Sequence, residues 1–180
     1  ELMCNTLNAD SLHFFVDQPI KNGKHRVYPD IVIARENGVG HYIILYMVDL
    51  KMDVGYYRNA AKSAEKSYID KAEELEHNLN SLRASKIITT NGWREDLNAI
   101  ASISFEIAET AHYDMVVISA ENAGGQKDKK ELLKLSSSSD FNIWALSAGV
   151  HPNNVREIKD IILLDDWKIL LERVRASCCK

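Results

Sequence analysis

Two carboxylates and one amine stand on neighbouring apolar segments where together they could serve phosphate chemistry. Asp30 precedes the β-branched segment 31–33, and Asp49 and Lys51 end the apolar segment 43–48. Carboxylate oxygens are the hard ligands that Mg²⁺ prefers, and Mg²⁺ binds through one or two protein carboxylates together with substrate phosphate. A nearby ammonium can orient or deprotonate an attacking water and offset the charge that develops on the phosphorus group. These residue types predict metal-assisted hydrolysis of a phosphate ester.

The two apolar segments are predicted to be buried strands joined by a tight turn. Their β-branched and apolar residues are typical of strands inside a sheet, and the connection 35–41 carries two glycines, which favours a hairpin. In an antiparallel hairpin the start of the first strand lies beside the end of the second, so we expect Asp30 to approach Asp49 and Lys51. Asp49 and Lys51 are two residues apart and share a face. Burying these charges is costly unless they pair or hold a metal.

The same residues resemble the signature of the PD-(D/E)XK, or restriction-endonuclease-like, nuclease superfamily: Pro-Asp, a variable gap, then Asp or Glu, any residue and Lys. Here it stands as Pro29-Asp30 and Asp49-Leu50-Lys51, with a strand, a turn and a second strand in the gap. The resemblance implies that Asp30 and Asp49 ligate Mg²⁺ or Mn²⁺, with the Leu50 carbonyl as a further ligand. It also implies that Lys51 serves the attacking water and that the fold has an αβββαβ core.

Simpler interpretations of these residues stay open. A surface Pro-Asp turn together with an Asp49–Lys51 ion pair at a strand end would need no metal. Asp53 continues the alternation of Asp49 and Lys51, and we interpret it as a turn or helix N-terminal carboxylate. Many members of the superfamily also carry an acidic residue on a helix before the first core strand; Glu1 and Asp10 are the candidates, and spacing favours neither.

The rest of the chain predicts helices and strands around one sheet. Expected after the motif are a helix over 56–83, a strand over 86–90, a turn at Asn91-Gly92, a helix over 93–109 and a strand over 113–119. Expected elsewhere are a strand over 11–16, a Lys-rich polar loop over 127–139, a strand over 141–146 and a helix over 165–173 capped by Asp165. The predicted fold class is α/β, with a central mixed sheet flanked by helices.

Length and composition favour a single nuclease-like domain over residues 1–180. With 46% hydrophobic residues, 180 residues suffice for one well-packed core and are few for two. The chain opens without an initiator Met, which allows a fragment of a longer chain. No apolar segment reaches membrane-spanning length and no signal-peptide pattern is present, so we expect a soluble, cytoplasmic protein. The three cysteines fit neither a disulfide framework nor a zinc site, and we interpret them as reduced thiols.

These observations predict a Mg²⁺- or Mn²⁺-dependent endonuclease, a type II restriction-like enzyme or a related DNA-cleaving module. The substrate that the resemblance favours is double-stranded DNA, and cutting both strands suggests a homodimer. The net charge of −4 weighs against a strongly basic nucleic-acid binder without excluding one. The alternatives are an RNA-cleaving nuclease or toxin domain, a non-catalytic partner-binding domain with the nuclease fold, and a small-molecule enzyme with a phosphate turn at Asn91-Gly92 or Gly124-Gly125.

Overall fold

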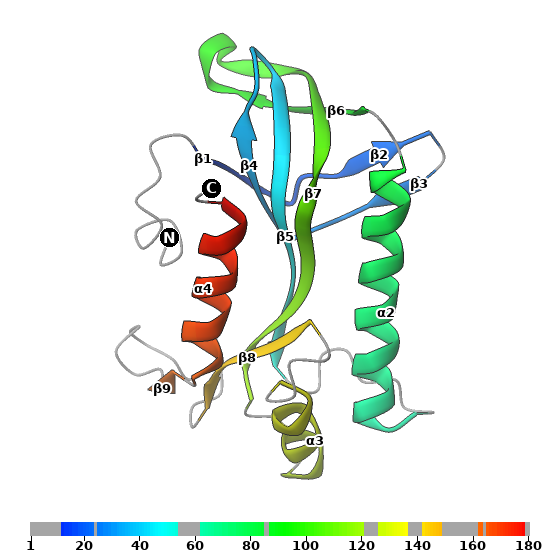
Figure 1. Ribbon diagram of the computed structural model, residues 1–180, viewed down its shortest axis with the longest axis vertical. Helices are drawn as coiled ribbons and strands as arrows, with labels where there is room; N and C mark the ends of the chain where they lie inside the picture. The colour runs from blue at the N-terminus through cyan, green and yellow to red at the C-terminus, as the bar shows by residue number, and fades with distance from the viewer. Residues whose placement is uncertain are drawn as a thin grey trace. The chain divides into compact units, whose positions relative to one another are not determined.

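The computed structural model describes residues 12–23, 25–53, 62–84, 87–120, 126–136, 142–148, 162–163 and 165–178. The helices are α2 (Ala64–Arg83), α3 (Gln126–Ser136) and α4 (Asp166–Cys178), with a 3-10 turn η1 (Glu95–Leu97). The strands are β1 (Leu12–Val16), β2 (Ile20–Asn22), β3 (His25–Val27), β4 (Ile31–Glu36), β5 (His41–Asp53), β6 (Ile88–Arg94), β7 (Ala99–Ser119), β8 (Ile143–Ala148) and β9 (Ile162–Leu163). The predicted class is confirmed: the protein is mixed α/β, with a central mixed sheet flanked by helices (Figure 1).

The central sheet is mixed because it contains both antiparallel and parallel strand pairs. Its order is β1-β4-β5-β7-β8-β9, and β6 pairs with β7 outside this path, while β2 and β3 form a separate two-stranded sheet. The pairs β1–β4, β4–β5, β6–β7 and β8–β9 are antiparallel, and β7–β8 is parallel. None of the described helices is long and apolar enough to cross a membrane.

Contacts divide the chain into two compact units, each assembled from separate segments. Unit 1 comprises residues 1–48, 77–113 and 173–180, and unit 2 comprises residues 49–76 and 114–172. Strands β5 and β7 and helices α2 and α4 each contribute residues to both units.

In unit 1, strands β4 and β5 form the hairpin that the sequence predicts. Ile31 pairs with Val48, and the backbone N–H of Asn37 donates to the carbonyl of His41 at 2.8 Å to close the turn. Two glycines of the connection, Gly38 and Gly40, have φ angles of +110° and +72°. Only glycine adopts such angles readily, which explains why they punctuate this turn.

The second hairpin of unit 1 corrects two predictions. Residues 93–109 do not form a helix, because β6 and β7 pair antiparallel around η1, with Trp93 opposite Ile100. The β7 side chains alternate: Ile103 and Phe105 are buried, while Ser104 between them is partly exposed. This period of two is typical of a strand. The predicted turn at Asn91-Gly92 is also wrong, since both residues lie inside β6, and Gly124-Gly125 lies outside the described residues.

In unit 2, helix α3 replaces the loop predicted at the Lys-rich segment. Its apolar residues Leu132 and Leu135 are buried, so they fix one face of the helix. Residues 137–139 of the predicted loop lie outside the described part of the chain. Strand β8 runs parallel to β7, and the buried carboxylate of Asp114 accepts a hydrogen bond from Trp144 Nε1 at 2.8 Å.

The long helix and the closing helix agree with the predicted pattern, with shifted ends. Helix α2 begins at Ala64, and residues 56–61 of the predicted helix lie outside the described residues. Its apolar residues at spacings of three and four are buried: Tyr68, Ala72, Leu75, Leu79 and Leu82. The carbonyl of Asp165 accepts the first hydrogen bonds of α4, from Lys168 and Ile169, so Asp165 occupies the expected N-cap position.

Candidate functional site

The candidate site begins at the end of β5, where the buried strand gives way to charged residues. Asp49 and Lys51 are two residues apart on β5, so their side chains share a face as predicted. Lys51 Nζ lies 2.7 Å from Asp49 Oδ2. Asp49 is 7% exposed, which makes it a buried carboxylate whose nearest cation comes from its own strand. Both residues belong to unit 2.

A second ammonium reaches the same carboxylate from helix α2. Lys71 Nζ lies 3.9 Å from Asp49 Oδ1 and 3.0 Å from Oε1 of Glu74, one turn further along the helix. The side chain of Lys71 is largely buried. From the sequence we did not single out Lys71. The signal for its true position is its spacing, because Lys71 lies three residues after Tyr68 and four before Leu75, which are both buried.

The electrostatics of this cluster are balanced, because two ammonium groups face two carboxylates. A buried carboxylate is strongly destabilised when its partner is removed, so Lys51 and Lys71 account for the ability of Asp49 to remain charged there. The contact from Lys51 is an ion pair without hydrogen-bond geometry. In the described part of the chain, no donor forms a hydrogen bond to the buried Oδ2 of Asp49. That oxygen therefore retains the capacity to accept a further ligand.

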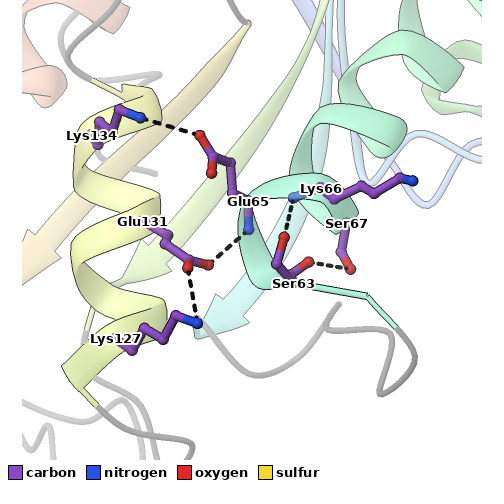
Figure 2. Close-up of polar contacts among 7 residues, drawn as sticks. All are labelled: Ser63, Glu65, Lys66, Ser67, Lys127, Glu131 and Lys134. Carbon is purple, nitrogen blue, oxygen red and sulfur yellow. Dashed lines mark hydrogen bonds and ion pairs between the residues drawn. The ribbon is translucent and has the colours of Figure 1, made fainter.

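Lys71 lies on helix α2, and a polar network holds the start of this helix (Figure 2). Ser63 Oγ accepts a hydrogen bond from the backbone N–H of Lys66 at 3.2 Å, which is the geometry of an N-cap. Glu131 of α3 accepts a hydrogen bond from the backbone N–H of Glu65 at 3.0 Å. Lys134 of α3 lies 3.3 Å from the Glu65 carboxylate. Helix α3 thus contacts the first turn of the helix that carries Lys71.

Asp30, the other predicted carboxylate, immediately precedes β4 in unit 1. Its backbone N–H donates to the carbonyl of Val48 at 2.9 Å, and its carbonyl accepts from Asp17 at 3.0 Å. The predicted antiparallel pairing is confirmed as far as Ile31 and Val48. The side chain of Asp30 is half-buried. Its role as a metal ligand, which the sequence resemblance implies, stays a prediction.

Of the remaining acidic or carbonyl ligands considered from the sequence, the structure describes some and not others. Leu50 lies between Asp49 and Lys51 on β5, so its carbonyl belongs to the strand backbone. Strand β5 persists to Asp53, which we had interpreted as a turn or helix N-terminal carboxylate; its side chain, like Glu1 and Asp10, lies outside the described residues. Within the described ranges, no three His, Cys, Asp or Glu side chains gather as a ready set of metal ligands.

No protein-family model, curated protein or solved structure matches the chain. A buried carboxylate beside two ammonium groups can serve either as an internal ion-pair network or as one arm of a cation site flanked by positive charge.

Proposed function

We propose that the protein is a metal-dependent endonuclease that hydrolyses phosphodiester bonds, with double-stranded DNA as its substrate. The observation that carries the proposal is the buried Oδ2 atom of Asp49, which accepts no hydrogen bond from the described residues and lies 2.7 Å from the Lys51 ammonium. The order Pro29-Asp30 and Asp49-Leu50-Lys51, shared with the PD-(D/E)XK signature, supports the same proposal.

The residues present suit Mg²⁺ or Mn²⁺. An anionic carboxylate oxygen is a hard ligand of the kind both ions prefer. Asp49 would hold the metal, with Asp30 and the Leu50 carbonyl as the further ligands that the family signature implies. When bound, the ion would supply Lewis-acid activation for phosphate ester hydrolysis.

The chain's own residues would then contribute charge and positioning. Lys51 would hold the attacking water beside the scissile phosphate and offset the negative charge that develops during attack. Lys71 would add a second positive charge on the side of Asp49 Oδ1, where its Nζ lies 3.9 Å away. Glu74, which pairs with Lys71 at 3.0 Å, would keep that ammonium in place.

The second candidate function is a non-catalytic partner-binding domain. The ion pairs themselves favour it, because Lys51 and Lys71 neutralise Asp49 without any metal. The two functions differ in one measurable property. A structural network has no affinity for divalent cations, whereas the nuclease site binds them through Asp49.

The test is cleavage of supercoiled plasmid and of single-stranded RNA by the purified protein, with Mg²⁺, with Mn²⁺ or with EDTA. Asp49→Asn and Lys51→Met are the test variants, and Asp70→Asn is the matched control, because Asp70 is a carboxylate of α2 that pairs with Lys62. We expect metal-dependent cleavage of the plasmid that both test variants abolish and the control retains. Cleavage of RNA without cleavage of plasmid would show that the substrate is RNA and not DNA. Cleavage that persists in EDTA would contradict the proposal.

Calorimetric titration with Mn²⁺ separates the two candidate functions when cleavage is absent. Binding that Asp49→Asn abolishes would keep the metal site and move the search to other phosphodiester substrates. Absence of both binding and cleavage in folded protein, as judged by circular dichroism, would favour the partner-binding domain.

A further inference from the structure

Unit 1 contains a groove that plays no part in the proposed nuclease site. Its volume is about 810 Å³, and it is lined by every residue of β1, by Glu36 and Tyr42, and by Trp93, Arg94 and Asp96 at the end of the β6 side. Gln18, which follows β1, donates a hydrogen bond through Nε2 to the carbonyl of Asn91 on β6 at 3.1 Å. This bond ties the two walls of the groove together.

One wall of the groove is the edge of a sheet. Among the described strands β1 is the first in the sheet and pairs with β4 alone. The backbone N–H of Asp17 donates to the carbonyl of Asp30 on the β4 side, so the Val16 carbonyl of the same peptide group points away from β4. Because main-chain groups alternate along a strand, the N–H and C=O of Val16 and Phe14 both face outward. Such groups are a template for another strand.

The side chains of the groove are suited to receive the alternating side chains of a strand. Phe15 and Tyr42 pack edge to face, with ring centroids 5.0 Å apart, and form a fixed aromatic surface. Trp93 on the opposite wall is 56% exposed and Val16 is 71% exposed. Large apolar side chains that remain exposed beside a strand edge are typical of interaction sites.

The accessible charge of the groove is negative. The carboxylates of Glu36 and Asp96 are both well exposed, whereas the side chain of Arg94 is only 12% exposed. Arg94 donates through Nε and Nη2 to both oxygens of Asp96, so these two charges match each other and Glu36 carries the negative charge that is left. His13, which lies 3.6 Å from Glu36, adds positive charge only when it is protonated. A ligand for this groove therefore gains from basic side chains.

We propose that this groove binds an extended, basic segment of a partner polypeptide, which pairs with β1 as an additional strand. Main-chain hydrogen bonds to the outward groups of Phe14 and Val16 supply the affinity, and the alternate side chains of the segment contact Trp93 and Glu36. Five residues of β1 span about 17 Å, so the groove takes a segment of roughly five residues.

The first experiment measures fluorescence anisotropy of a labelled six-residue peptide that alternates Lys and Val. Two matched peptides accompany it: one with N-methyl groups on alternate amides, which cannot pair as a strand, and one with Glu in place of Lys. We expect the Lys peptide to bind at least tenfold more tightly than either. Equal affinity for all three, or no binding by any up to about 1 mM, would overturn the proposal.

Variants of the protein locate the binding edge. Val16→Pro removes an outward N–H, a change that an edge strand tolerates, and Val16→Ala keeps that N–H while trimming the side chain. We expect Val16→Pro to weaken binding of the Lys peptide about fivefold and Val16→Ala less than twofold. Glu36→Gln, which leaves β1 unchanged, should weaken the Lys peptide and not the Glu peptide.

Two further measurements test whether the groove binds something other than a peptide. A dimer in light scattering that Val16→Pro dissociates, without peptide binding, would assign the edge to a second copy of the chain. Binding of an oligothymidine that Trp93→Ala abolishes would assign the groove to a single-stranded nucleic acid. Either result would overturn the peptide proposal.

Discussion

Lys71 Nζ lies 3.9 Å from Oδ1 of Asp49, while Lys51 Nζ lies 2.7 Å from Oδ2 of the same carboxylate. One buried acid is therefore approached by ammonium groups from a strand and from a helix. If Asp49 also holds a divalent cation, Lys71 must repel that cation while attracting a substrate phosphate. Binding of metal and activity on substrate should then respond to Lys71 in opposite directions.

Replacing Lys71 with Met tests this opposition. Removal of the positive charge should tighten Mn²⁺ binding about tenfold, since like charges a few ångströms apart repel strongly in a buried site. Plasmid cleavage should fall, because the phosphate loses a partner. Lys66→Met is the control, since Lys66 is an exposed lysine of the same helix. Unchanged Mn²⁺ affinity in Lys71→Met would separate Lys71 from the metal site.

Replacing Lys51 with Met should destabilise the fold as well as abolish cleavage. The variant leaves Asp49 buried without its nearest cation, which costs about 3 kcal/mol of unfolding free energy. The double variant Lys51→Met with Asp49→Asn should recover part of that loss, because the unpaired charge is gone. Chemical denaturation measures both. Lys62→Met, which breaks the exposed pair with Asp70, should change stability by less than about 1 kcal/mol.

Glu131 should contribute to stability through the first turn of α2. Glu131→Ala removes the acceptor for the Glu65 N–H and should cost about 1 kcal/mol. Glu131→Gln keeps an acceptor and loses the favourable charge at the helix N-terminus, so its cost should be smaller. Lys127→Ala is the control, because Lys127 is exposed and 3.8 Å from Glu131. If all three variants were as stable as the unchanged protein in thermal denaturation, the contact between Glu131 and Glu65 would not stabilise α2.

The Arg94–Asp96 pair should be lost only in acid. The hydrogen bonds from Arg94 lower the pKa of Asp96 below its ordinary value of 3.8, and the same bonds raise the pKa of Arg94. Because the folded pKa of Asp96 is depressed, its contribution to stability is complete above pH 3.8 and disappears as the pH falls through the folded value. A carbon-detected NMR titration should place the Asp96 midpoint below 3.8. Arg94→Gln should return it towards 3.8, and no difference between the two proteins would contradict this assignment.

The β4–β5 hairpin was predictable because its determinants are local. Gly38 and Gly40 mark the turn, and the apolar run that ends at Asp49 sets the strand and the face on which Lys51 lies. The β6–β7 hairpin was not, because residues 99–109 mix Ala and Glu with alternating Ile and Phe. The partner that decides between helix and strand is β6, and this pairing is a tertiary feature that local propensity does not reveal.

Lys71 illustrates the same limit within the candidate site. The helix that carries it and the buried stripe beside it follow from the spacing of Tyr68 and Leu75. Its contact with Asp49 depends on how α2 packs beside the end of β5 within unit 2, which involves residues about 20 positions apart. Helix α3 was likewise interpreted as a loop, because its lysines mask the short apolar repeat that Leu132 and Leu135 provide.

The chain passes between unit 1 and unit 2 four times, after residues 48, 76, 113 and 172. Each passage falls inside a regular element, in β5, α2, β7 and α4 respectively, and none falls in a linker. No single cut in the gene can therefore release either unit as a continuous polypeptide. Neither unit can therefore be expressed alone by truncating the chain at one position.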